Sequence, residues 1–251
     1  MPTALIVEDE PEANKLLGML IKLRGYRSAS AYNGREAMEH LDRLAPDILF
    51  LDLMLPDVSG FEVCRAIKSA RATCLVPLVI VSARIAERNR VDSFHAGADE
   101  FVPKPYTPDQ IFDALRRAEA LREQAARDRI EGTARFADLD EDDPAREFAR
   151  LRSLVLGRSP LDVDEAGRVN AALERVESRI GDWAGKHPDA PPASVRYQLS
   201  HDGLVLDCVR ISWLDSPDRP LAESLAADLA PFDEIHLKRD EDRLTLVKRW
   251  G

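Results

Sequence analysis

The sequence predicts an α/β protein of two domains. The first domain is expected to hold a parallel sheet between helices, and the second an antiparallel sheet covered by helices, an α+β arrangement. In the first half, short apolar runs alternate with stretches of helical spacing, which is the order typical of parallel sheets. In the second half, helical stretches precede strand-like stretches that alternate around turn residues. The 251 residues are enough for two such domains.

Four apolar runs mark strands of the first domain. Near-continuous runs of this kind are typical of strands buried on both faces, and they cover residues 4–7, 48–51, 78–81 and 101–102. Helical spacing fills the intervals at about 13–23, 34–44, 59–70, 85–96 and 108–131.

The helix expected at 108–131 runs past the end of the first domain. Its apolar stripe continues unevenly to Ile130, which fits either a coiled-coil dimer seam or one buried face. A homodimer through this connector or through the first domain is therefore left open. Residues 124–144 are assigned to a helical and acidic linker, because Ala137–Pro144 carries five carboxylates.

The second domain is assigned to residues 145–251. Helices are expected at 145–157 and 164–184, followed by a proline-rich turn. The strands 195–200 and 204–211 flank His201-Asp202-Gly203, a sequence that favours a hairpin. A short helix at 220–229 and strands at 234–238 and 244–248 complete the domain.

Composition restricts the classes of function. The net charge is −10, with −3 before residue 125 and −7 after it, whereas DNA-binding domains usually present basic surface. No run of 18 apolar residues is present, so no membrane span is expected. Three cysteines without CxxC spacing favour reduced thiols, and the chain is expected in the cytoplasm.

Charged and hydroxyl side chains stand at the ends of the four apolar runs. Glu8 and Asp9 follow the first run, Asp52 the second, Ser82 ends the third and Lys104 comes shortly after the fourth. Ends of neighbouring parallel strands share one edge of a sheet, where ligands bind. The set suits phosphoryl transfer to a carboxylate, with Asp52 as nucleophile and the three carboxylates as hard oxygen ligands for Mg²⁺. A lone carboxylate at a strand end would usually be solvated surface, but an ordered set favours a site.

The first 123 residues resemble the receiver domains of bacterial response regulators. That resemblance implies a flavodoxin-like, doubly wound sheet of five parallel strands. It also implies a histidine kinase or phosphotransferase as phosphoryl donor, with self-dephosphorylation afterwards. The segments that carry it are Ala-Leu-Ile-Val-Glu-Asp-Glu (4–10), Asp-Leu-Met-Leu-Pro-Asp-Val-Ser-Gly (52–60), Val-Ser-Ala-Arg (81–84), Gly-Ala-Asp-Glu-Phe (97–101) and Lys-Pro-Tyr (104–106).

The resemblance also implies residue roles. Met54 would offer a backbone carbonyl to the metal, and the Lys104–Pro105 bond would be cis. Phe101 stands at the aromatic switch position, where many relatives have tyrosine, so a switch here would rest on packing. The other implied roles are the acidic metal-binding pair Glu8 and Asp9, the phosphoacceptor Asp52, the switch hydroxyl Ser82 and the phosphoryl-pairing Lys104.

The second half resembles, more weakly, the GHKL ATPase domains of histidine kinases and anti-sigma-factor kinases. Glu174 stands on the long helix, but Ser178 replaces the family's asparagine, and residues 211–222 lack the glycines that let a backbone approach phosphates. ATP binding is therefore expected to be lost, and no separate enzyme activity is predicted.

The predicted function is a response regulator whose output domain binds a downstream protein. A transcription factor with an atypical DNA-binding output is the alternative, which a basic surface stripe would favour. An output that still binds nucleotide is a further alternative, which a glycine-lined pocket would favour.

Overall fold

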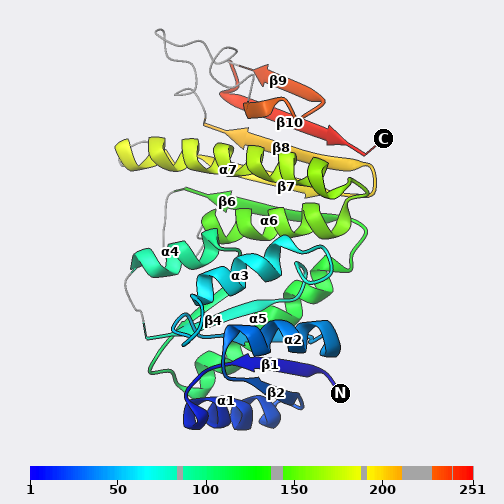
Figure 1. The fold of residues 1–251 in the computed structure, drawn as a ribbon. Helices are drawn as coiled ribbons and strands as arrows, with labels where there is room; N and C mark the ends of the chain where they lie inside the picture. Colours follow the sequence, from blue (N-terminus) through cyan, green and yellow to red (C-terminus); the bar gives the residue numbers. More distant parts are fainter. Residues whose placement is uncertain (84–86, 137–143, 188–190, 211–227, 239, 251) are drawn as a thin grey trace. The chain divides into compact units, whose positions relative to one another are not determined.

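The computed structural model describes residues 1–83, 87–136, 144–187, 191–210, 228–238 and 240–250. The chain forms two compact units, Met1–Ala126 and Arg127–Gly251 (Figure 1). None of the helices in these described ranges is long and apolar enough to cross a membrane.

The first unit is built on a five-stranded parallel sheet, as predicted. The strand order is β2-β1-β3-β4-β5, and the polar ends of β1 and β3 are neighbours because Ala4 pairs with Ile48 and Val7 with Leu51. Residues of β1, β3 and β4 are almost wholly buried, which explains why their sequences read as continuous apolar runs. The strands are β1 Thr3–Val7, β2 Arg27–Ala31, β3 Ile48–Leu51, β4 Leu78–Ser82 and β5 Glu100–Pro103.

In the described part of this unit, helices α1 to α5 accompany the sheet, with α1 and α5 in contact with each other and α2 in contact with α3. Side-chain caps fix two helix starts, since Asn33 accepts from the Glu36 amide and Thr107 forms a capping box with Gln110. The helices are α1 Pro11–Leu23, α2 Gly34–Leu44, α3 Gly60–Ser69, α4 Glu87–His95 and α5 Pro108–Ala125.

Two elements differ from the prediction. Strand β2 was not singled out, because its sequence Arg-Ser-Ala-Ser-Ala lacks large apolar residues. The helix expected to reach residue 131 ends at Ala125. Residues 130–135, assigned to the linker on the sequence, form strand β6 instead. Pairing β6 with β7 satisfies its backbone groups and buries Ile130 and Ala134, a gain that a solvated helix would not provide.

The second unit is an antiparallel five-stranded sheet with helices, as predicted. The strand order is β6-β7-β8-β10-β9, and the tight β7–β8 turn uses Gly203 at φ +159, where a Cβ would lie 2.3 Å from the Lys248 carbonyl oxygen. The elements are β6 Ile130–Arg135, α6 Pro144–Arg158, α7 Val163–Lys186, β7 Ser194–Leu199, β8 Gly203–Val209, β9 Glu234–Lys238 and β10 Arg243–Arg249. Most of the short helix expected at 220–229 lies outside the described residues.

The two faces of the second sheet have opposite character. Helices α6 and α7 contact each other and cover one face of the sheet (Figure 1). The buried apolar residues Val195, Leu206 and Leu246 belong to a single face by their strand pairing. The alternating residues on the other face are mostly polar or charged, with Val205, Val209 and Val247 among them. The face covered by α6 and α7 is therefore the core face, as the alternation in the sequence predicts.

Candidate functional site

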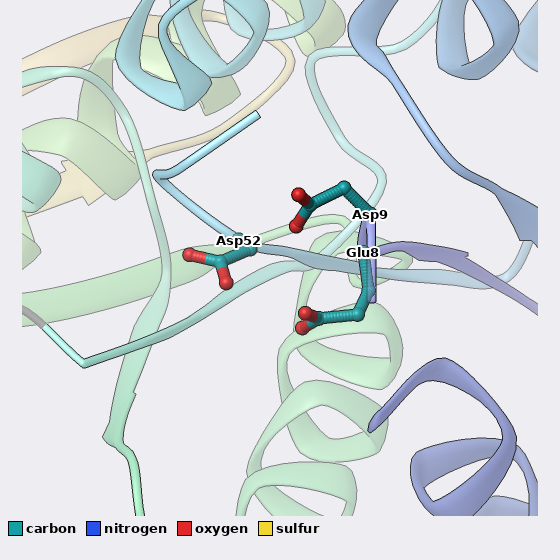
Figure 2. A group of neighbouring side chains, drawn as sticks. All are labelled: Glu8, Asp9 and Asp52. Atoms are coloured by element: carbon teal, nitrogen blue, oxygen red, sulfur yellow. The ribbon is translucent and has the colours of Figure 1, made fainter. Parts of the chain in front are cut away.

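Three carboxylates converge at the carboxyl edge of the first sheet. Glu8 and Asp9 directly follow β1, and Asp52 directly follows β3, which is its neighbour in the sheet. One ligand oxygen from each residue lies within 4.8 Å of the others, and Figure 2 shows the three side chains gathered there. Glu8 and Asp52 are buried and Asp9 is exposed. The arrangement gives the hard oxygen ligands that a divalent cation needs.

Lys104 joins two of these carboxylates. Its Nζ donates to Glu8 Oε2 and to Asp52 Oδ2, each at 2.5 Å. It follows β5, and the Lys104–Pro105 bond is cis, as the resemblance implied. One ammonium against three carboxylates leaves the site with an excess of negative charge. A bound Mg²⁺ fits that excess.

Burial and neighbouring charges shift the pKa values of Glu8 and Lys104. Burial raises the pKa of Glu8, and it does so against the hydrogen bond from Lys104. Burial alone would lower the pKa of Lys104, but hydrogen bonds to Asp52 and Glu8 outweigh it and raise that pKa. The lysine therefore stays charged across the neutral range.

The Asp52 carboxylate is oriented from both sides. Lys104 binds Oδ2, while the Met54 amide donates to Oδ1 at 3.0 Å. Gly60 makes this loop compact, because a Cβ there would lie 2.3 Å from the Asp52 carbonyl oxygen. Ser82 is fully buried at the end of β4, and Phe101 is half-buried on β5.

Two supporting residues escaped the sequence reasoning. Asn14 on α1 is buried, and its Nδ2 donates to the Glu8 carbonyl while Oδ1 accepts from Ser30. Asp57, in the loop after β3, accepts from the amides of Gly34 and Arg35 and so ties that loop to α2. Both contacts depend on tertiary distance, and only the polar identity of the residues was visible beforehand.

The second unit brings together no such set among its described residues. Glu174 and Ser178 lie exposed on α7, and Glu174 faces Arg152 at 3.7 Å. The glycine-poor segment 211–222, on which the loss of ATP binding was predicted, lies outside the described residues.

Comparison with known proteins gives consistent matches. The model of the response regulator receiver domain matches residues 4–116. The response regulator MprA of Mycobacterium ulcerans is 32% identical over 180 residues, covering 70% of this chain and 76% of MprA. The transcriptional regulatory protein BaeR of Escherichia coli is 30% identical over 207 residues, covering 80% of this chain and 69% of BaeR. A response regulator structure from Chloroflexus aurantiacus is 26% identical and covers 48% of this chain and 99% of its own, with a TM-score of 0.46.

Proposed function

This chain belongs to the two-component response regulator family, and on that premise we propose that Asp52 accepts a phosphoryl group from a histidine kinase and so controls the second unit. One observation carries the proposal. The Asp52 carboxylate lies beside Glu8 and Asp9 at the edge of the sheet, with Lys104 on one of its oxygens.

The chemistry is nucleophilic substitution at phosphorus. An Asp52 oxygen forms a bond to phosphorus, the bond to the donor histidine nitrogen breaks, and that imidazole leaves with the electron pair. Lys104 holds a phosphoryl oxygen by its positive charge, and Ser82 donates to another. Glu8, Asp9, Asp52 and the Met54 carbonyl would hold Mg²⁺, which neutralises charge on the transferring group when bound. Ser82 moving toward the phosphoryl group vacates space for Phe101, and α4, β5 and α5 repack.

The test is covalent labelling. Acetyl phosphate with Mg²⁺ should add one phosphoryl group to the full chain by intact-mass spectrometry, and none to Asp52→Asn. Asp42→Asn, an exposed carboxylate on α2, is the matched control and should label as wild type. Undiminished labelling of Asp52→Asn would contradict the assignment.

For the output, the relatives favour DNA binding over the protein-binding output predicted from the sequence. The matches to MprA and BaeR extend well beyond the receiver, and BaeR is named a transcriptional regulatory protein. A row of paired residues on the sheet face opposite α6 and α7 supports the same reading. It crosses all five strands and carries three cations, in the order Arg135, Ser194, Val209, Arg243 and Lys238. Cations in such a row suit the phosphate backbone of a duplex, for which Arg243 and Lys238 would exchange their present partners Asp207 and Glu241.

Titration with DNA duplexes distinguishes a DNA-binding output from a protein-binding output. Fluorescence anisotropy with random and selected duplexes at two salt concentrations should show binding that weakens with salt. Arg135→Glu should reduce the affinity and lower the salt slope by about 1 or more. Arg168→Glu, on the exposed side of α7, is the matched control.

A protein-binding output is the second candidate. The net charge of −7 after residue 124 favours it, because an acidic domain repels a phosphate backbone. The resemblance to GHKL ATPases gains no support from the comparisons, whose family match covers the receiver alone. Absence of any duplex binding, with capture of a defined partner by the beryllofluoride-loaded chain, would favour this candidate.

A further inference from the structure

Strand β9 lies at one edge of the second sheet, at the end of the strand order. Among the described strands only β10 pairs with it. Ile235 points to the core face, since it pairs with the buried Leu246, yet its side chain is 46% exposed. An edge strand offers unpaired N–H and C=O groups, and an exposed apolar side chain there favours pairing with another strand.

The opposite edge of the same sheet differs. In β6 the core-face residues Ile130 and Ala134 are only 2% and 1% exposed. Pairing along β6 would cover no apolar surface that is now open. The two edges of one sheet thus differ in the driving force for association, and β9 has the larger one.

Two copies of the β9 sequence have complementary side chains when they pair in antiparallel orientation. Glu-Ile-His-Leu-Lys is centred on His236, so in an antiparallel pair of two copies Glu234 lies opposite Lys238 and Ile235 opposite Leu237. A lysine at an edge ordinarily discourages pairing. Here it would meet a carboxylate in both halves of the pair.

We propose that β9 pairs with β9 of a second copy of this chain. The two sheets then join edge to edge about a two-fold axis at His236, with α6 and α7 of both copies on the same side. Two pairs of opposite charge and two apolar pairs hold the seam, and backbone hydrogen bonds run along it. This dimer needs neither phosphorylation nor any particular output ligand.

Glu234 and Lys238 have partners within one chain that differ from those expected between two chains. Exchanging their charges therefore separates the two sets of contacts. Glu234 binds Arg249 and His236, and Lys238 binds Glu241. Exchanging the charges at 234 and 238 places a lysine beside Arg249 and a glutamate beside Glu241. The exchange therefore breaks the contacts within one chain but preserves complementarity between two chains.

Sedimentation equilibrium of the unphosphorylated full chain tests the proposal. The wild type should dimerise in the micromolar range. Glu234→Lys and Lys238→Glu should each weaken self-association about tenfold or more, because both charged pairs become repulsive. An equimolar mixture of the two variants should form a heterodimer near wild-type affinity, and the double variant should dimerise again.

Two controls separate this seam from other contacts. Glu131→Lys on β6 should leave association unchanged, and circular dichroism should show every variant folded. A wild type that stays monomeric throughout, or a mixture that associates no better than its components, would overturn the proposal.

Discussion

The two units place their charged residues differently. In the first, Glu8, Asp52 and Lys104 come from distant parts of the sequence and meet, because parallel strands end at the same edge. In the second, antiparallel neighbours end at opposite edges, and the charges spread in rows over one face. Parallel topology therefore concentrates chemistry at a point, whereas this antiparallel sheet distributes it over a surface.

The sequence supplies a way to follow each unit. All three tryptophans, Trp183, Trp213 and Trp250, belong to the second unit, and the first unit has none. Tryptophan fluorescence therefore reports unfolding of the second unit, while far-ultraviolet circular dichroism reports both.

The largest expected effect is loss of a buried ion pair. Lys68 donates to Asp99 at 2.6 Å and to the carbonyls of Cys74 and Val76. Lys68→Met leaves the Asp99 carboxylate buried without its cation and should cost about 3–5 kcal/mol of unfolding free energy. Urea unfolding should show the loss in circular dichroism but not in fluorescence.

The second unit has a comparable pair. Arg152 lies 2.8 Å from Glu177, and both are buried. Arg152→Met should lower the urea midpoint of the tryptophan fluorescence transition, because that fluorescence reports unfolding of the second unit. An exposed lysine of α1, Lys15, gives the control, since Lys15→Met should change neither transition appreciably. A cost for Lys68→Met below about 1 kcal/mol would contradict the expected value.

The next effect contrasts two glycines. In Gly60→Ala the new Cβ would meet backbone atoms of Asp52 and Leu53 at 2.3 and 2.6 Å, so the variant should lose about 3 kcal/mol and label more slowly with acetyl phosphate. Gly167 on α7 has nothing within 4 Å of a new Cβ. Gly167→Ala should stabilise the second unit by about 0.5–1 kcal/mol. Equal changes in unfolding free energy for Gly60→Ala and Gly167→Ala, measured in urea, would contradict this prediction.

The difference between the two units also explains which features of the fold and site could be predicted from the sequence. The fold classes and the convergence of Glu8, Asp52 and Lys104 follow from polar residues placed directly after apolar runs. Strand β6 was missed, because Ile130 also fits a helical stripe and only pairing with β7 decides between them. Asn14 and Asp57 were missed as supports, because their partners are set by packing between α1, α2 and the loops.

Mg²⁺ should act on one unit only. At a hundredfold excess over its Kd the ion should stabilise the first unit by about 2.7 kcal/mol. Glu8→Gln and Asp9→Asn should each reduce that gain, since each removes an anionic ligand. Thermal unfolding with Mg²⁺ and with EDTA measures the gain, and the tryptophan transition should not move. A shift of the second unit alone would place the ion elsewhere.

The smallest effect concerns helix starts and pH. Asp57 accepts from the Gly34 and Arg35 amides, and these bonds, the Gly34 bond above all, lower its pKa from the ordinary 3.8. A lowered folded-state pKa means that the carboxylate stabilises the fold above the unfolded-state pKa and that this contribution is lost as pH falls through the folded-state pKa. Because the Asp57 side chain is exposed and solvent screens its charge, Asp57→Asn should cost only about 0.5 kcal/mol at neutral pH and almost nothing once the pH is below the folded-state pKa. In the second unit Asp162 caps α7 through one amide, that of Glu165, so Asp162→Asn should cost less. Urea midpoints of both variants across pH measure this, and a cost for Asp57→Asn that does not change with pH would show that the amide bonds do not depend on the charge.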